Sequence, residues 1–146
     1  MNMYSSNRTD IRRTFFDVWR KQQAGEPLSA LENIVADIIR LHPEYHALLS
    51  ADADRALDRD WRPEGGETNP FLHMGLHIAI REQLSIDRPA GVKAAYAALL
   101  KRSGDAHAAE HMMLECLAES LWHGQRDGRL PDDQVYLACL KSRGTG

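Results

Sequence analysis

The chain has 146 residues and a formal net charge of −3, from 18 Lys and Arg against 21 Asp and Glu. A chain of this length buries about 70% of its extended surface in one core, so we expect a single domain over residues 1–146. The charges are mixed along the chain, which argues against nucleic acid or anionic lipid as partners. No signal-peptide-like segment and no run of 18 apolar residues occurs, so we expect a cytoplasmic protein that does not bind membranes.

The two cysteines, Cys116 and Cys139, are widely spaced and form no Cys-x-x-Cys motif. This spacing gives no support to a zinc ribbon or a thioredoxin-type site. We therefore expect both to be reduced thiols that pack in the core.

Helical signals begin near the N-terminus. Thr9 or Asp10 is suited to cap a first helix, which should end near Gly25. Ser29 and Glu32 then form a capping box ahead of a second helix with apolar residues at helical spacing. Pro43 interrupts this helix and predicts a new one over 43–53, with His42 as the residue before it.

Residues 58–69 contain two glycines, a proline and many charged side chains, and predict the longest irregular loop. Asn69 and Pro70 then begin a helix that is apolar around nearly its whole circumference, which is typical of a central, buried helix. Further helices are predicted over 92–102, 106–128 and 132–142, the second of them capped by Asp105. The expected fold is all-α, a single-domain bundle of about six helices.

Six of the seven histidines occur in pairs with the spacing His-x-x-x-His. On a helix this spacing places both imidazoles on one face, about 6 Å apart, which is close enough to share a metal ion. The pairs are His42 with His46, His73 with His77, and His107 with His111.

The helical period predicts which way these rings point. In the helix after Pro70, the stripe that contains His73 and His77 continues through apolar residues, so both rings should face the core. The same holds for the pair His107 and His111. The first pair is less regular, because His42 precedes Pro43 and the two rings need not share a helical face.

From these patterns we hypothesise that one divalent transition metal ion, zinc, nickel or iron, lies between the helix at Pro70 and the helix at Asp105. Glu110 lies next to the second pair and is a candidate general base or a residue that orients a ligand. Many imidazoles and few carboxylates argue against a di-iron oxo site. The expected ligands come from His73, His77, His107 and His111, with His46 as an outside candidate.

Two other classes of function fit the same residues. The protein is alternatively a metal-free interaction or scaffold protein whose histidines form a hydrogen-bonded core network. A further alternative is a pocket for a small anion, formed where the helix N-termini at Pro43, Pro70 and Asp105 converge.

The string HAAEH at 107–111 matches the His-x-x-Glu-His motif of inverted zinc proteases. Those enzymes need a larger mixed α/β framework, which this chain does not supply. Whether the protein is an enzyme stays open. If it is one, a metal-dependent hydrolase or transferase is expected.

Three segments carry a resemblance to a known family: HPEYH at 42–46, NPFLHMGLHIAIREQ at 69–83 and HAAEHMMLECLAESLW at 107–122. They resemble the uncharacterised bacterial family known as domain of unknown function 1841, over almost the whole chain. The resemblance implies a small, bacterial, mainly helical protein, and it implies no activity or ligand. A looser similarity, of arrangement rather than motif, links the histidine pairs to damage-inducible helical bundles that hold a metal with three histidines.

Overall fold

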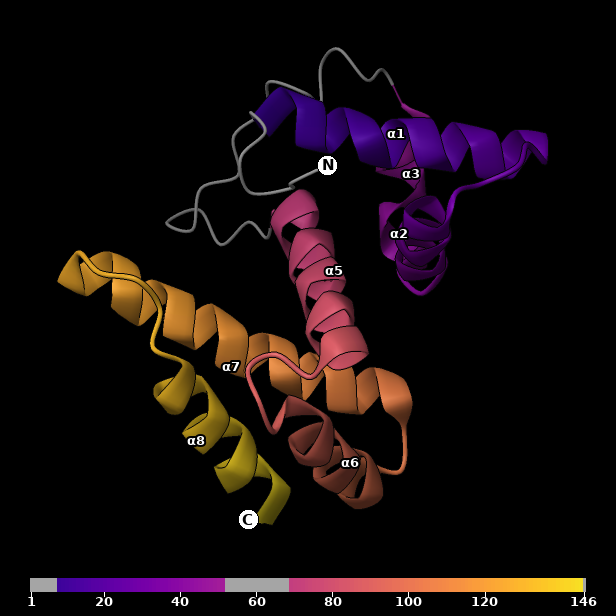
Figure 1. Ribbon diagram of the computed structural model, residues 1–146. Helices are drawn as coiled ribbons and strands as arrows, with labels where there is room; N and C mark the ends of the chain where they lie inside the picture. Colours follow the sequence, from indigo (N-terminus) through magenta and orange to yellow (C-terminus); the bar gives the residue numbers. More distant parts are fainter. Residues whose placement is uncertain (1–7, 52–68, 146) are drawn as a thin grey trace. The chain divides into compact units, whose positions relative to one another are not determined.

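The computed structural model describes residues 8–51 and 69–145. Within these two ranges the regular elements are seven α-helices and one short 3-10 helix, so the expected all-α fold is confirmed. The predicted loop at 58–69 lies outside the described residues, apart from Asn69. The elements in chain order are α1 (Arg8–Ala24), α2 (Ala30–Arg40), η1 (Pro43–Tyr45), α3 (His46–Ser50), α5 (Pro70–Ile86), α6 (Val92–Ser103), α7 (Ala106–Asp127) and α8 (Asp133–Thr145) (Figure 1).

The chain divides into two compact units, and the division falls inside α5. The first unit ends at Ile78 and the second begins at Ala79, so α5 contributes its first half to one unit and its second half to the other. The expectation of one domain over 1–146 stays a prediction.

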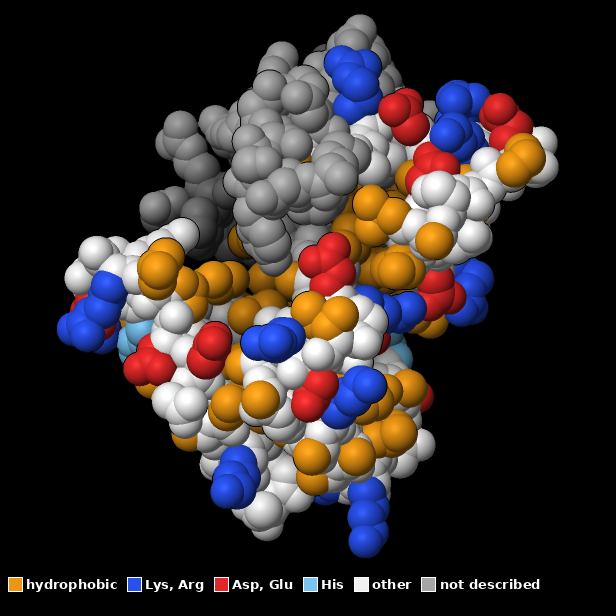
Figure 2. Space-filling model, viewed as in Figure 1, with side chains coloured by type: hydrophobic (Ala, Val, Ile, Leu, Met, Phe, Trp, Pro, Cys, Tyr) orange, Lys and Arg blue, Asp and Glu red, His pale blue; other side chains and the backbone are white. Residues whose placement is uncertain are grey.

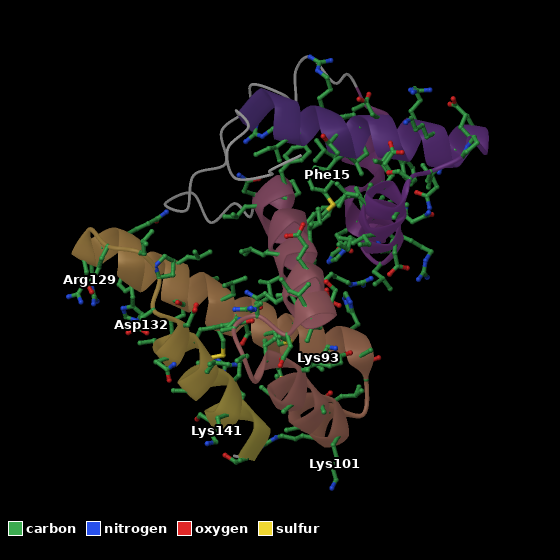
Figure 3. The ribbon with its side chains drawn as sticks, in the orientation of Figure 1. Phe15, Lys93, Lys101, Arg129, Asp132 and Lys141 are labelled. Atoms are coloured by element: carbon green, nitrogen blue, oxygen red, sulfur yellow. A yellow bond between two sulfur atoms is a disulfide. The ribbon has the colours of Figure 1, made fainter. Side chains whose placement is uncertain are left out.

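An apolar core holds the first unit together. The Phe71 ring on α5 lies 5.9 Å from the rings of both Phe15 and Phe16 on α1, and Phe15, labelled in Figure 3, is fully buried. Removing such side chains from water is the main favourable contribution to folding. The other buried members of this core are Val18, Val35, Ala36, Ile38, Ile39, Leu49, Met74 and Ile78.

The helix ends of the first unit follow the local sequence signals. The Ser29 hydroxyl accepts a hydrogen bond from the Glu32 backbone N–H, and the Glu32 carboxylate accepts one from the Ser29 N–H, which confirms the predicted capping box. At the start of α5, the Asn69 side chain accepts hydrogen bonds from the N–H groups of Phe71 and Leu72. These caps satisfy backbone donors that the helices leave unpaired.

In the second unit, α6, α7 and α8 pack against one another (Figure 1). Gly104, with a φ of 73°, ends α6 in the left-handed conformation that suits glycine. The Asp105 carboxylate then accepts a hydrogen bond from the Ala108 N–H and caps α7, as predicted. The Tyr136 hydroxyl on α8 donates to the side chain of Gln83 over 2.7 Å, which ties α8 to the second half of α5.

The prediction of two reduced thiols is wrong, because Cys116 on α7 and Cys139 on α8 form a disulfide. The sequence offered no sign of this bond, since the two residues lie on different helices. Only the packing of α7 against α8 brings their Cα atoms to 5.7 Å, a separation typical of disulfides.

Charged side chains of both signs are interspersed on the face drawn in Figure 2. Lys101 on α6 and Lys141 on α8 are exposed and project outward (Figure 3). None of the helices in the described ranges has the length and apolar character needed to cross a membrane.

Candidate metal centre

The site begins where Pro43 ends α2. A continuing α-helix would donate the N–H of residue 43 to the carbonyl of Ile39, and proline has no N–H. The last carbonyls of α2 therefore need other donors. The His42 N–H donates to the Ile39 carbonyl instead, over 3.0 Å. The His42 ring does not cap the following turn, and this turn is a 3-10 helix that precedes α3 rather than the single helix predicted over 43–53.

The ring of His42 satisfies another carbonyl at the end of α2. Its Nδ1 lies 2.7 Å from the Ile38 oxygen. A carbonyl only accepts hydrogen bonds, so Nδ1 carries the proton and donates it. The Nε2 atom of the neutral ring is then left with a lone pair. This is the common arrangement of a metal-binding histidine, whose second nitrogen donates to a carbonyl or carboxylate and so fixes the tautomer.

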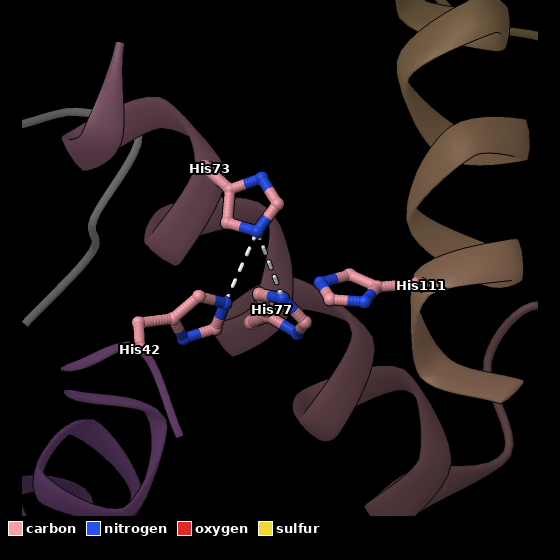
Figure 4. Close-up of side chains that lie close together, drawn as sticks. All are labelled: His42, His73, His77 and His111. Carbon is pink, nitrogen blue, oxygen red and sulfur yellow. Dashed lines mark hydrogen bonds between the residues drawn. The ribbon is translucent and has the colours of Figure 1, made fainter. Parts of the chain in front are cut away.

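His73 and His77 stand one turn apart on α5, as their spacing predicts (Figure 4). The Nε2 atom of His73 lies 3.1 Å from the Nε2 of His42 and 3.3 Å from the Nε2 of His77. Each of the three residues offers one ligand nitrogen within 4.8 Å of the others. His42 and His77 are 2% and 1% exposed, and His73 is partly buried. Three ring nitrogens thus converge in a largely dry part of the first unit.

His46, the outside candidate, has a different environment. Its Nε2–H donates to the Ile39 carbonyl over 2.8 Å, and its ring packs 4.5 Å from the ring of Trp19. His46 therefore helps to satisfy the end of α2. It is not part of the group of described side chains that converge on one point.

Tyr45 borders the cluster. Its ring is nearly parallel to that of His42, with 5.5 Å between ring centroids, and it meets His73 edge-on at 6.1 Å. Burial, and to a smaller degree the neighbouring charge of Glu44, raise the pKa of Tyr45, so its phenol stays protonated at neutral pH. The ring acts as an apolar wall against two of the three imidazoles.

The remaining predicted ligands, His107 and His111, lie on α7 in the second unit. Their rings are 4.1 Å apart and meet at 67°, so the predicted pairing on one helical face is confirmed. The hypothesis that this pair shares an ion with His73 and His77 stays a prediction.

Glu110, the candidate base, is buried in the second unit. Its carboxylate accepts a hydrogen bond from Nε–H of Arg81 over 3.2 Å. A guanidinium at this distance stabilises the ionised carboxylate and holds it in place. The role of Glu110 in catalysis stays a prediction.

His42 is the residue that sequence reasoning left out. It belongs to one of the three pairs, but Pro43 follows it directly, so the spacing of four does not guarantee that His42 and His46 share a helical face. The same proline accounts for its role, since α2 ends ahead of it and the Ile38 carbonyl at that end accepts a hydrogen bond from the ring. The sequence signal for this site was therefore a histidine directly before a helix-ending proline.

The fold and the site define an all-α protein with a buried three-histidine cluster at the junction of α2, η1 and α5. The model of the family described as a domain of unknown function (DUF1841) matches residues 7–142, nearly the whole chain. The chain belongs to this family, and the predicted resemblance is confirmed. No curated protein and no solved structure matches the sequence.

Proposed function

We propose that this protein binds one divalent transition metal ion through the Nε2 atoms of His42, His73 and His77. One observation carries the proposal: the Nε2 of His73 is within hydrogen-bonding distance of both other Nε2 atoms.

A metal-free hydrogen-bond network accounts poorly for this geometry. A ring nitrogen has one in-plane position, which holds either a proton or a lone pair. Since the Nδ1 of His42 carries that ring's proton, a proton on Nε2 of His73 is needed to bridge these two rings. The Nε2 of His77 then lies next to the Nε2 of His73, whose only proton already forms the hydrogen bond to His42. With all three rings neutral, only one of the two contacts at the Nε2 of His73 can be a hydrogen bond.

A cation satisfies all three lone pairs at once. Two nitrogens bound at about 2.0–2.1 Å to one ion lie about 3.3–3.4 Å apart in tetrahedral geometry and about 2.8–3.0 Å apart at a right angle. The Nε2 of His73 is 3.1 Å from the Nε2 of His42, a distance between these two ranges. It is 3.3 Å from the Nε2 of His77, which is within the tetrahedral range. The spacing supports a common ion for the three rings.

The donor set favours particular metals. Imidazole nitrogen suits zinc, nickel and iron, whereas calcium and magnesium prefer oxygen ligands. The group of described residues that converges here contains imidazoles alone. We therefore propose zinc, nickel or iron as the ion. If the protein is an enzyme, a metal-dependent hydrolase or transferase is the class of activity to test first. We also propose His107 and His111 on α7 as ligands, because the sequence predicts both.

The test is metal uptake by the full chain, purified without a histidine tag and stripped by a chelator. Isothermal titration with zinc is expected to give one equivalent per chain. His73→Gln and His77→Gln should each lose tight binding, because each removes a nitrogen ligand and keeps a polar side chain of similar size. His123→Gln is the matched control, since the His123 side chain is 37% exposed and lies outside the cluster.

Circular dichroism must show that all three variants are folded. If the wild-type chain takes up no zinc while folded, the histidines belong to a structural network, and the scaffold function replaces the metal-binding one. Equal losses in the control and in the cluster variants would also refute the assigned ligands.

A further inference from the structure

We infer that the disulfide between Cys116 and Cys139 is a site of reversible thiol modification: a low-molecular-weight thiol reacts at Cys139 and loosens the end of α8. The site lies in the second unit and does not depend on the proposed metal binding. The inference follows from the unequal exposure of the two cysteines, from the contacts that hold α8, and from the packing of the turn before it.

The two cysteines of the bond differ in exposure. Cys116 on α7 is 1% exposed, whereas Cys139 on α8 is partly exposed. In thiol–disulfide exchange a thiolate attacks one of the two sulfur atoms, so the rate at each sulfur depends on how accessible it is. In the folded protein the sulfur of Cys139 is therefore the one that an incoming thiol attacks, and the sulfur of Cys116 is the leaving group.

The exchange is a substitution at sulfur. The thiolate of the incoming molecule forms a new S–S bond with the Sγ of Cys139, and the bond between Cys139 and Cys116 breaks. The electron pair of the broken bond stays on the Sγ of Cys116, which takes up the proton that the incoming thiol gave up. The number of disulfide bonds is unchanged, so no separate oxidant or reductant is needed. Attack by Cys116 on the mixed disulfide reverses the step.

Few other contacts hold α8 beyond the bond. The buried side chains of α8 are Tyr136, one turn before Cys139, and Leu140, directly after it. One turn after Cys139, Arg143 forms an ion pair with Glu115 on α7, but these two side chains are 41% and 60% exposed. Ion pairs at such exposed positions contribute little to stability. The disulfide is therefore the strongest link that the described residues show between α7 and the last turns of α8.

The turn before α8 is held in another way. A Cβ atom on the buried Gly124 of α7 would lie 2.9 Å from the carbonyl oxygen of Arg129, so the backbone of the turn packs directly on α7. The Asp132 carboxylate accepts a hydrogen bond from the Gln134 N–H at the start of α8. These contacts do not involve the disulfide. Opening the bond should therefore loosen residues 139–145 and leave the turn in place.

The first experiment identifies the modified sulfur in the full, unreduced chain. The folded protein is incubated with glutathione near neutral pH and quenched with acid, and the thiols that remain are alkylated. Peptide mass spectrometry is expected to find glutathione on Cys139 and the alkyl group on Cys116. The rate should rise in proportion to the glutathione concentration. Urea below the unfolding transition should leave it unchanged, because the attack takes place on the folded protein.

The second experiment measures amide hydrogen exchange in the glutathione adduct and in the unreduced protein. Residues 139–145 are expected to exchange at least about tenfold faster in the adduct, because the bond no longer restrains them. Residues 120–132 should keep their rates. The Cys116→Ser/Cys139→Ser double variant is the control, since it lacks the bond and cannot form the adduct. If folded, it should show the same fast exchange over 139–145 without glutathione.

Several results would overturn the inference. Glutathione on Cys116, or on both cysteines equally, would refute the selective attack on Cys139. An adduct that forms only when urea unfolds the protein would refute a reaction of the folded state. Equal acceleration of hydrogen exchange throughout the second unit would show general destabilisation in place of local loosening. Two free thiols before glutathione is added would remove the site itself.

Discussion

The Nε2 atoms of His42 and His73 lie 3.1 Å apart, although 31 residues separate the two along the chain. One ring belongs to the end of α2 and the other to α5, so an ion between them would join two segments of the first unit. The proposed metal binding would therefore be coupled to folding, because the unfolded chain does not hold the two rings together.

We expect metal to stabilise the protein. A ligand that binds only the folded state at about 100 times its Kd raises the free energy of unfolding by about 2.7 kcal/mol. Urea denaturation of the stripped protein, with and without zinc, measures this difference. The His123→Gln variant should show the same gain and His77→Gln should show none. An unchanged denaturation midpoint on adding zinc would contradict the coupling.

Pro43→Ala is expected to weaken metal binding without removing a ligand. Alanine restores an N–H at residue 43, which can donate to the Ile39 carbonyl and extend α2. The backbone at His42 would then change, and its ring would lose its fixed hydrogen bond to Ile38. Changes to such supporting contacts lower metal affinity by about 10–100-fold. Pro27→Ala, in the exposed connection before α2, is the control for isothermal titration.

The predicted ligands on α7 require a separate test. His107→Ala and His111→Ala are each expected to weaken zinc binding, because the sequence predicts both as ligands. Competition against a chromophoric chelator measures the affinity. Full affinity in both variants would limit the site to His42, His73 and His77.

Glu110→Gln should affect stability more than metal uptake. The amide keeps the shape of the side chain but loses the charge that faces Arg81, and the Glu110 and Arg81 side chains are only 8% and 27% exposed. Weakening this hydrogen bond between charged groups should lower the free energy of unfolding by about 1–3 kcal/mol. Glu119→Gln, at an exposed position on α7, should lower the free energy of unfolding far less. A large loss of zinc binding in Glu110→Gln would instead indicate a role at the ion.

Reduction of the Cys116–Cys139 bond should destabilise the second unit. The bond joins two residues with a sequence separation of 23. A cross-link that closes a loop of that length lowers the conformational entropy of the unfolded chain, and this raises the free energy of unfolding by about 3 kcal/mol. Denaturation with and without a reductant, compared with the Cys116→Ser/Cys139→Ser double variant, measures the effect. Thiol titration of the unreduced, unfolded protein should find no free thiol. Two free thiols there would show that the bond does not form.

The sequence by itself determined the helices and most of their ends. Capping is decided over three or four residues, so Ser29 with Glu32, Asn69 before α5 and Asp105 before α7 were readable from their neighbours. The spacing of four within each histidine pair is likewise local, because one turn of helix sets the distance between the rings.

Only the tertiary structure decided which rings and which thiols meet. The approach of His42 to His73, and of Cys116 to Cys139, depends on how one helix packs against another. That packing results from many apolar contacts distributed over the chain, and apolar contacts are not directional enough to be read from a short motif. For this reason the sequence predicted a histidine site on α5, while its partner at the end of α2 became visible only in the folded chain.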